Sequence, residues 1–239
     1  MITSAESVKS KSLEFKFIFF LALLLLGFSA DIFAHGVDDN TRNFLLNNTG
    51  VQFVAFMYIG AKHMITGYDH LLFLLGVIFF IFKPKDIILY VSMFTIGHSL
   101  TLLFGVMADI QVNAYLIDAI IGLSVVYKGF ENLGGFKTVF GRSFNTRAAV
   151  LIFGLFHGFG LATKIQELTL SQDGLFVNLI AFNIGVEMGQ VLALIMIVLL
   201  LNIWRKNSSF NTFATTTNSL LMSAGFMLMG FQLTGYFIN

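Results

Sequence analysis

Two histidines and an aspartate stand close together where an apolar segment of the chain begins. His63, Asp69 and His70 lead directly into residues 71–80, which are apolar enough to enter a bilayer. Ionisable side chains are costly in hydrocarbon, and they persist mainly where they face a protein interior or a water-filled path. Imidazole and carboxylate are also common ligands of transition metals. This run is therefore the first candidate for a functional site.

Three more ionisable side chains fall at a similar depth in other apolar segments. At 1.5 Å per residue, His70, His98 and His157 each lie about 12–14 Å from the outer end of a predicted helix. Glu187 lies about 18 Å from the outer end of its own helix. A single intramembrane histidine is more often a packing residue than a ligand, but four unrelated packing residues are not expected at one depth. We therefore predict a metal site that His70, His98, His157 and Glu187 build from four helices.

His63 and Asp69, in the run that begins the first predicted span, are expected to have different roles from His70. His63 is two helical turns before His70 on nearly the same face, so we expect it at the outer mouth of the path. Asp69 points about 100° away from His70 on an ideal helix. We expect its carboxylate to orient a neighbouring ligand or to form an ion pair, rather than to share the metal of His70.

Polar side chains near these positions could orient the imidazoles or bind water. Thr95 and Ser99 flank His98 in the sequence, whereas Asn183 and Gln190 lie on either side of Glu187. We predict these four residues as a supporting layer around the ligands.

Two other charged features have simpler interpretations. Lys128 and Glu131 are three residues apart, which predicts an ion pair on the surface of one helix. Asp118 lies near the outer end of the third predicted span and could be interfacial.

The composition excludes several classes of function. The chain of 239 residues is 56% hydrophobic and 11% charged, whereas a soluble domain is roughly 45–50% apolar and about 25% charged. The net charge of only +1 argues against a nucleic-acid partner. Cysteine is absent, so disulfides, thiolate ligands and a cysteine nucleophile are excluded. The chain is expected to be an integral membrane protein with the bilayer as its surroundings.

Apolar runs of about 20 residues are long enough to cross a bilayer as helices. They predict an all-α, polytopic membrane bundle of six transmembrane helices that forms one domain, residues 35–239. The six spans are expected near residues 62–82, 87–107, 112–132, 148–166, 175–203 and 215–237.

Residues 1–34 have the pattern of a signal peptide. Lysines precede an apolar core, and small residues follow it up to Ala34. The alternative is an uncleaved first transmembrane helix. Cleavage after Ala34 would leave His35 at the new N-terminus, where its imidazole and the free α-amine could chelate a metal together; a simple polar tail is the other interpretation.

The distribution of lysine and arginine predicts the orientation. The loops after the first, third and fifth spans carry the basic residues, and such loops stay in the cytoplasm. Both mature termini would then lie outside, which agrees with an exported N-terminus.

Four blocks of residues resemble the HupE/UreJ family of bacterial membrane proteins. They are His63-x5-Asp69-His70, residues 94–102 around His98, Phe156-His157-Gly158, and residues 182–190 around Glu187. The resemblance covers roughly residues 55–195. It departs from the best-known pattern at Met64, where proline is usual, and after His157. The resemblance implies a nickel or cobalt permease in the bacterial inner membrane, associated with hydrogenase or urease maturation.

Our leading hypothesis is accordingly a permease for a divalent transition metal. Imidazole suits nickel, cobalt, zinc, copper and iron alike, so the ligands do not rank these ions. The family resemblance favours nickel or cobalt. His63, with His35, would capture the ion, which the intramembrane site would then bind. The sequence leaves the oligomeric state open, a homo-oligomer included.

Two other functions fit part of the pattern. An intramembrane zinc hydrolase could use a His₃ or His₂Glu site with an open position, although a HExxH motif is missing. A b-type haem protein could use His98 and His157 as axial ligands, but Glu187 and the first motif would then have no role. We favour a transporter over an enzyme.

Overall fold

The computed structural model describes Asn43, residues 49–166 and residues 173–238. The chain divides into the units Met1–Gly36 and Val37–Asn239, and every described residue belongs to the second unit. The predicted signal peptide and His35 lie outside the described residues, so both remain predictions.

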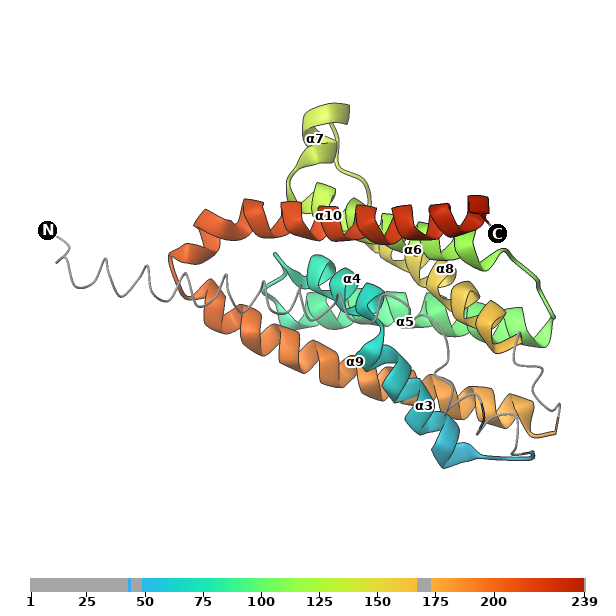
Figure 1. The fold of residues 1–239 in the computed structure, drawn as a ribbon. Coiled ribbons are helices and arrows are strands. Elements are labelled where there is room, and N and C mark those ends of the chain that lie inside the picture. The colour runs from blue at the N-terminus through green and yellow to red at the C-terminus, as the bar shows by residue number, and fades with distance from the viewer. Residues whose placement is uncertain (1–42, 44–48, 167–172, 239) are drawn as a thin grey trace, which may run out of the picture. The chain divides into compact units, whose positions relative to one another are not determined.

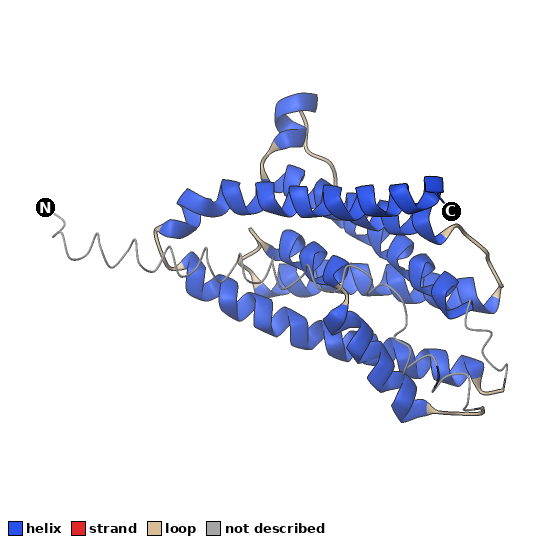
Figure 2. Ribbon diagram, in the orientation of Figure 1, coloured by secondary structure: helices blue, strands red, loops and turns tan. Residues whose placement is uncertain are grey.

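All regular structure in the described residues is helical, as the sequence predicts (Figure 2). Figure 1 labels the helices in chain order. They are α3 (Phe53–Thr66), α4 (Tyr68–Ile78), α5 (Pro84–Met107), α6 (Ala114–Asn132), α7 (Gly135–Phe140), α8 (Thr146–Gln166), α9 (Leu175–Arg205) and α10 (Ser209–Ile238).

Four of these helices, α5, α8, α9 and α10, are long and apolar enough to cross a membrane. They coincide with four of the six predicted spans. Helix α6 coincides with the predicted span at 112–132 but carries Asp118, Lys128 and Glu131, which lower its apolar character. The first predicted span, 62–82, was expected to be one continuous helix, and that prediction is wrong. Two helices, α3 and α4, take its place.

The break between α3 and α4 is the single residue Gly67. Its backbone is extended, with φ −73° and ψ 100°. Its N–H donates to the carbonyl of His63 over 2.9 Å, and its carbonyl accepts from the N–H of Leu71 over 3.1 Å. Glycine is among the poorest helix formers, and these two bonds keep the backbone groups at the break paired. The chain can therefore change direction here without leaving backbone groups unsatisfied.

The helices pack as three close pairs: α3 with α9, α5 with α8, and α6 with α10. Glycine at each contact makes the approach possible, as expected for helices in a bilayer. A Cβ atom at Gly185 would lie 1.9 Å from the carbonyl oxygen of Met57, and one at Gly154 would lie 2.4 Å from that of Phe94. Any larger side chain at these two positions would force the helices apart.

The register of these contacts gives the direction of each pair. Helices α3 and α9 run in the same direction, and so do α5 and α8, whereas α6 and α10 run in opposite directions. The defining contacts are Met57–Gly185 and Ala61–Gly189, Phe94–Gly154 and His98–Gly158, and Gly122–Met229 and Gly129–Met222.

The charged residues of α6 form buried pairs. Lys128 and Glu131 are ion-paired as predicted, but Lys128 is only 3% exposed, so the pair does not lie on the helix surface. Asp118 is buried and its Oδ2 lies 2.8 Å from Nζ of Lys164 on α8. Asp118, for which an interfacial position was considered, thus faces α8 and is covered by it.

Candidate metal site

Four histidines from four helices meet beside the break between α3 and α4. The ring of His70, at the start of α4, is central. Its centroid lies 5.2 Å from that of His63 on α3, 6.0 Å from that of His98 on α5 and 5.0 Å from that of His157 on α8. His70, His98 and His157 are buried, whereas His63 is half-buried. Three histidines predicted to share a layer are thus brought together by the fold.

His63 lies closer to His70 than a continuous helix would allow. We expected it two helical turns away, at about 10 Å along the axis. The break at Gly67 redirects the chain, so that the two rings stand edge to face instead. His63 is therefore part of the cluster, and it is the most exposed of the four histidines.

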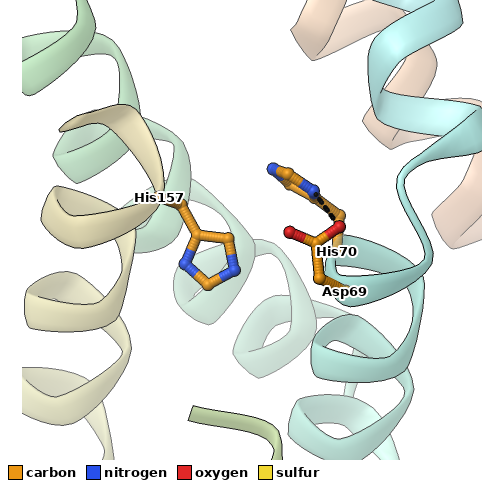
Figure 3. Close-up of side chains that lie close together, drawn as sticks. All are labelled: Asp69, His70 and His157. Carbon is orange, nitrogen blue, oxygen red and sulfur yellow. Dashed lines mark hydrogen bonds and ion pairs between the residues drawn. The ribbon is translucent and has the colours of Figure 1, made fainter. Parts of the chain in front are cut away.

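Asp69 also joins the cluster, contrary to our expectation that it would point away from His70. Its Oδ1 lies 3.0 Å from Nδ1 of His70 (Figure 3). Asp69, His70 and His157 each offer one ligand atom, and these atoms all lie within 4.8 Å of one another. Both residues of the pair stand in the first turn of α4, where side chains lean back toward the helix start. Gly67 leaves room there, since a Cβ on it would lie 2.8 Å from Nδ1 of His70.

Hydrogen bonds orient two of the imidazoles. Nδ1 of His70 donates to the Asp69 carboxylate, and Nδ1 of His157 donates over 2.7 Å to the carbonyl of Phe153, one turn earlier in α8. A neutral imidazole carries one proton, so Nε2 of each ring keeps its lone pair. Metal-bound histidines commonly donate their other ring nitrogen to a carboxylate or a backbone carbonyl in this way.

The cluster also holds nitrogen atoms that lack protein partners. Within the described part of the chain, Nε2 of His70 and both ring nitrogens of His98 are buried and make no hydrogen bond. Buried polar groups are nearly always satisfied. A bound metal ion or water would satisfy these atoms, and the donor set of imidazoles with one carboxylate suits Ni²⁺, Co²⁺, Zn²⁺, Cu²⁺ or Fe²⁺.

Aromatic rings enclose the site from the side of α4 and α5. The centroid of Phe94 lies 4.9 Å from that of His157 and 6.2 Å from that of His98. Phe73, on the turn after His70, lies 5.5 Å from His157. Both phenylalanines are almost completely buried. They exclude water on this side and hold the imidazole planes in place.

Glu187 is not in the cluster, although the sequence placed it there. It is exposed on α9, whereas Asn183, one turn earlier, is buried. Helix α9 packs on α3 through Gly185 and Gly189, and this contact fixes its rotation with Glu187 turned outward. The fourth histidine, His63, occupies the α9 side of the site instead, with its centroid 6.0 Å from that of Phe182.

The predicted supporting residues divide into two groups. Thr95 donates to Oε1 of Gln190 over 2.8 Å, so this pair ties α5 to α9. Asn183 donates to the carbonyl of Leu179 over 3.0 Å, and its Oδ1 is buried without a hydrogen bond to the described residues, as is the hydroxyl of Ser99. These two side chains retain the capacity to bind water.

Sequence reasoning missed the roles of Gly67 and Phe94. A signal for the first was present, because an isolated glycine inside a helical pattern marks a weak point, and this one separates His63 from Asp69. Nothing distinguished Phe94 from the other 28 of the 29 phenylalanines.

A comparison with protein families identifies the chain. The model of a family described as HupE / UreJ protein matches residues 39–239. The chain belongs to the HupE/UreJ family. The match includes all eight described helices and every residue of the histidine cluster. No curated protein and no solved structure matches this chain. HupE/UreJ membership, together with the four long apolar helices, supports a membrane protein with a metal-related accessory or transport role.

Proposed function

We propose that this HupE/UreJ protein is a permease that binds a divalent transition-metal ion inside the bilayer. The observation that carries the proposal is the meeting of His63, His70, His98 and His157 beside the break in the first span. Discontinuous helices are a recurrent way for transporters to build an ion site at mid-membrane depth. Family membership gives independent support for a role with metals.

Six crossings account for the packing, with α3 and α4 together as the first. The two helices have 14 and 11 residues. Placed in line they would reach about 38 Å at 1.5 Å per residue, which leaves a margin for the bend over a hydrocarbon core of about 30 Å. Successive spans alternate in direction. The first and fifth spans should therefore be parallel, and so should the second and fourth. The third and sixth spans should be antiparallel. The observed pair directions agree with this order. Residues 1–34 then act as the signal peptide, and both mature termini lie outside the inner membrane.

The ion would bind through the lone pairs of the imidazoles and the Asp69 carboxylate. Half-buried His63 stands on the side of the outer half of the first span, so it receives the ion first, with His35 as an earlier contact. His70, His98 and His157 then hold it. Neutral imidazoles and one carboxylate leave a net charge of about +1 with the ion bound, which limits the cost of its burial. Nickel or cobalt is favoured by the family, because the ligands alone suit several ions.

A second candidate is an intramembrane zinc hydrolase. It is favoured by one observation, the trio of Asp69, His70 and His157 within 4.8 Å, since catalytic zinc sites use three protein ligands and an open position. The haem alternative loses support, because the ring of Phe94 packs against both His98 and His157.

Metal uptake by cells that express the protein tests the proposal. The His70→Ala, His157→Ala double variant should reduce nickel or cobalt uptake to the level of cells without the protein. The matched control is Ser219→Ala with Ser223→Ala, two exposed positions on α10. Equal amounts of each variant in the membrane fraction establish that both are inserted. Unchanged uptake in the histidine variant would exclude the permease, and retention of zinc with hydrolysis of a lipid or peptide would favour the enzyme.

A further inference from the structure

The segment between α6 and α8 presents apolar side chains away from the packed helices. Its helix α7 stands apart from the bundle (Figure 1). Val139 is 65% exposed, Phe140 59% and Phe144 40%. Unlike the exposed residues of the long helices, these belong to a connection that is predicted to lie on the cytoplasmic side. Their exposure therefore needs a different explanation from contact with the hydrocarbon core.

The exposed side chains are held in a fixed arrangement. Phe136 anchors the segment to α6, with its ring centroid 4.7 Å from that of Tyr127 and 4.9 Å from that of Phe130. The centroid of Phe144 packs 5.1 Å from the same ring. The anchored side of α7 also carries Phe140, whose ring centroid lies 6.2 Å from that of Phe136 and 6.1 Å from that of Phe144. Val139 and Phe140 nevertheless remain more than half exposed.

Glycines at both ends of α7 set its direction. Gly134 and Gly141 have φ of +74° and +68°, a conformation that side chains rarely adopt. They allow the chain to turn sharply out of α6 and again after Phe140. The two glycines therefore determine where α7 begins and ends.

The charge of the segment is entirely positive. Lys137, Arg142 and Arg147 are exposed, and the sequence has no aspartate or glutamate from residue 132 to residue 166. The guanidinium of Arg142 lies 5.4 Å from the ring centroid of Phe144, so a cation and an apolar ring share one surface. Aromatic and aliphatic side chains beside lysine and arginine are typical of segments that bind the interface of anionic membranes.

We propose that residues 133–147 bind anionic phospholipids at the cytoplasmic surface of the membrane. Val139 and Phe140 enter the boundary between headgroups and acyl chains, and Lys137 and Arg142 contact the phosphate groups. The positive charge and the position between α6 and α8, two of the predicted spans, select a lipid surface as the occupant. This interaction is separate from metal binding and does not depend on it.

The chain has no cysteine, so one label can be placed at a chosen position. Full-length Val139→Cys would carry an environment-sensitive fluorophore in vesicles of phosphatidylcholine, with or without phosphatidylglycerol. We expect a blue shift of the emission, and quenching by brominated lipid, in the vesicles that contain phosphatidylglycerol. The matched control is Asn211→Cys, exposed near the start of α10 on the same predicted side. Its emission should remain that of a label in water.

A second variant tests whether binding depends on the positive side chains or on the apolar side chains alone. Lys137→Gln with Arg142→Gln, in the Val139→Cys background, should lose most of the blue shift because the phosphate contacts are gone. The exposed positions of both residues leave the bundle intact, which the thermal stability of the purified variant checks. The proposal is overturned if the label stays in water in phosphatidylglycerol vesicles. It is equally overturned if the shift is the same in neutral vesicles or in the glutamine variant.

Discussion

Nδ1 of His70 lies 3.0 Å from Oδ1 of Asp69, the residue directly before it in the chain. Neighbours inside a helix point about 100° apart and do not usually bond side chain to side chain. The pair forms here because α4 begins at Tyr68 and Gly67 leaves space above it. The carboxylate fixes the orientation of the central imidazole in the cluster, and this gives the first prediction.

Replacing Asp69→Asn should weaken metal binding without unfolding the protein. The amide fills the same space but removes the charge that holds the His70 proton on Nδ1. Loss of such an orienting carboxylate typically costs about 10- to 100-fold in metal affinity. Calorimetric titration of the purified variant with nickel or cobalt measures the change. Asp109→Asn, in an exposed turn, is the control and should bind as the wild type does. An unchanged affinity in Asp69→Asn would show that the carboxylate does not support the site.

Replacing Gly67→Ala should damage the site from the backbone. The added Cβ would lie 2.8 Å from Nδ1 of His70 and 3.1 Å from Oδ1 of Asp69, so one of these groups must move. We expect a fall in metal affinity at least as large as that of Asp69→Asn. Gly230→Ala is a matched control, because no atom lies within 4 Å of a Cβ at that position of α10. That change should be neutral or should stabilise the helix by up to about 1 kcal/mol. Equal behaviour of the two variants would contradict the close packing at the break.

Two separate substitutions, Glu187→Gln and His63→Gln, distinguish the ligand set predicted from the sequence from the cluster seen in the structure. Glu187 is exposed on α9, so its replacement should change metal affinity by less than about twofold, within ordinary error for a residue outside the site. His63 contacts His70, so its replacement should weaken binding clearly. Both measurements use the same titration. A large loss in Glu187→Gln with none in His63→Gln would restore the ligand set predicted from the sequence.

Arg205→Ala should destabilise the C-terminal end of α4. Nη2 of Arg205 on α9 donates to the carbonyls of Ile78 over 2.5 Å and Phe79 over 2.7 Å. Without it, the carbonyl of Ile78 keeps only the N–H of Ile81, and the carbonyl of Phe79 loses the guanidinium donor. An unsatisfied buried carbonyl typically costs about 1–3 kcal/mol. Thermal unfolding in detergent should show a lower midpoint for Arg205→Ala than for the wild type. The neighbouring exposed Lys206→Ala provides the comparison. Identical midpoints would show that α4 is held by its apolar contacts alone.

The amino-acid sequence determined the class of protein and identified most residues of the histidine cluster. Composition and the lengths of the apolar runs depend only on local sequence, and they predicted membrane helices that match α5, α8, α9 and α10. The depths of His70, His98 and His157 followed from a constant rise per residue. The family match then extended the resemblance to residues 39–239.

The tertiary structure decided the rotation of each helix and the break in the first span. Glu187 points outward because Gly185 packs on Met57 of α3, a contact between residues more than a hundred positions apart. No periodicity within α9 specifies that partner. Asp69 and His63 likewise joined the cluster only because the chain bends at Gly67. A sequence places residues along a helix axis, but the direction in which they face depends on which helix packs beside them.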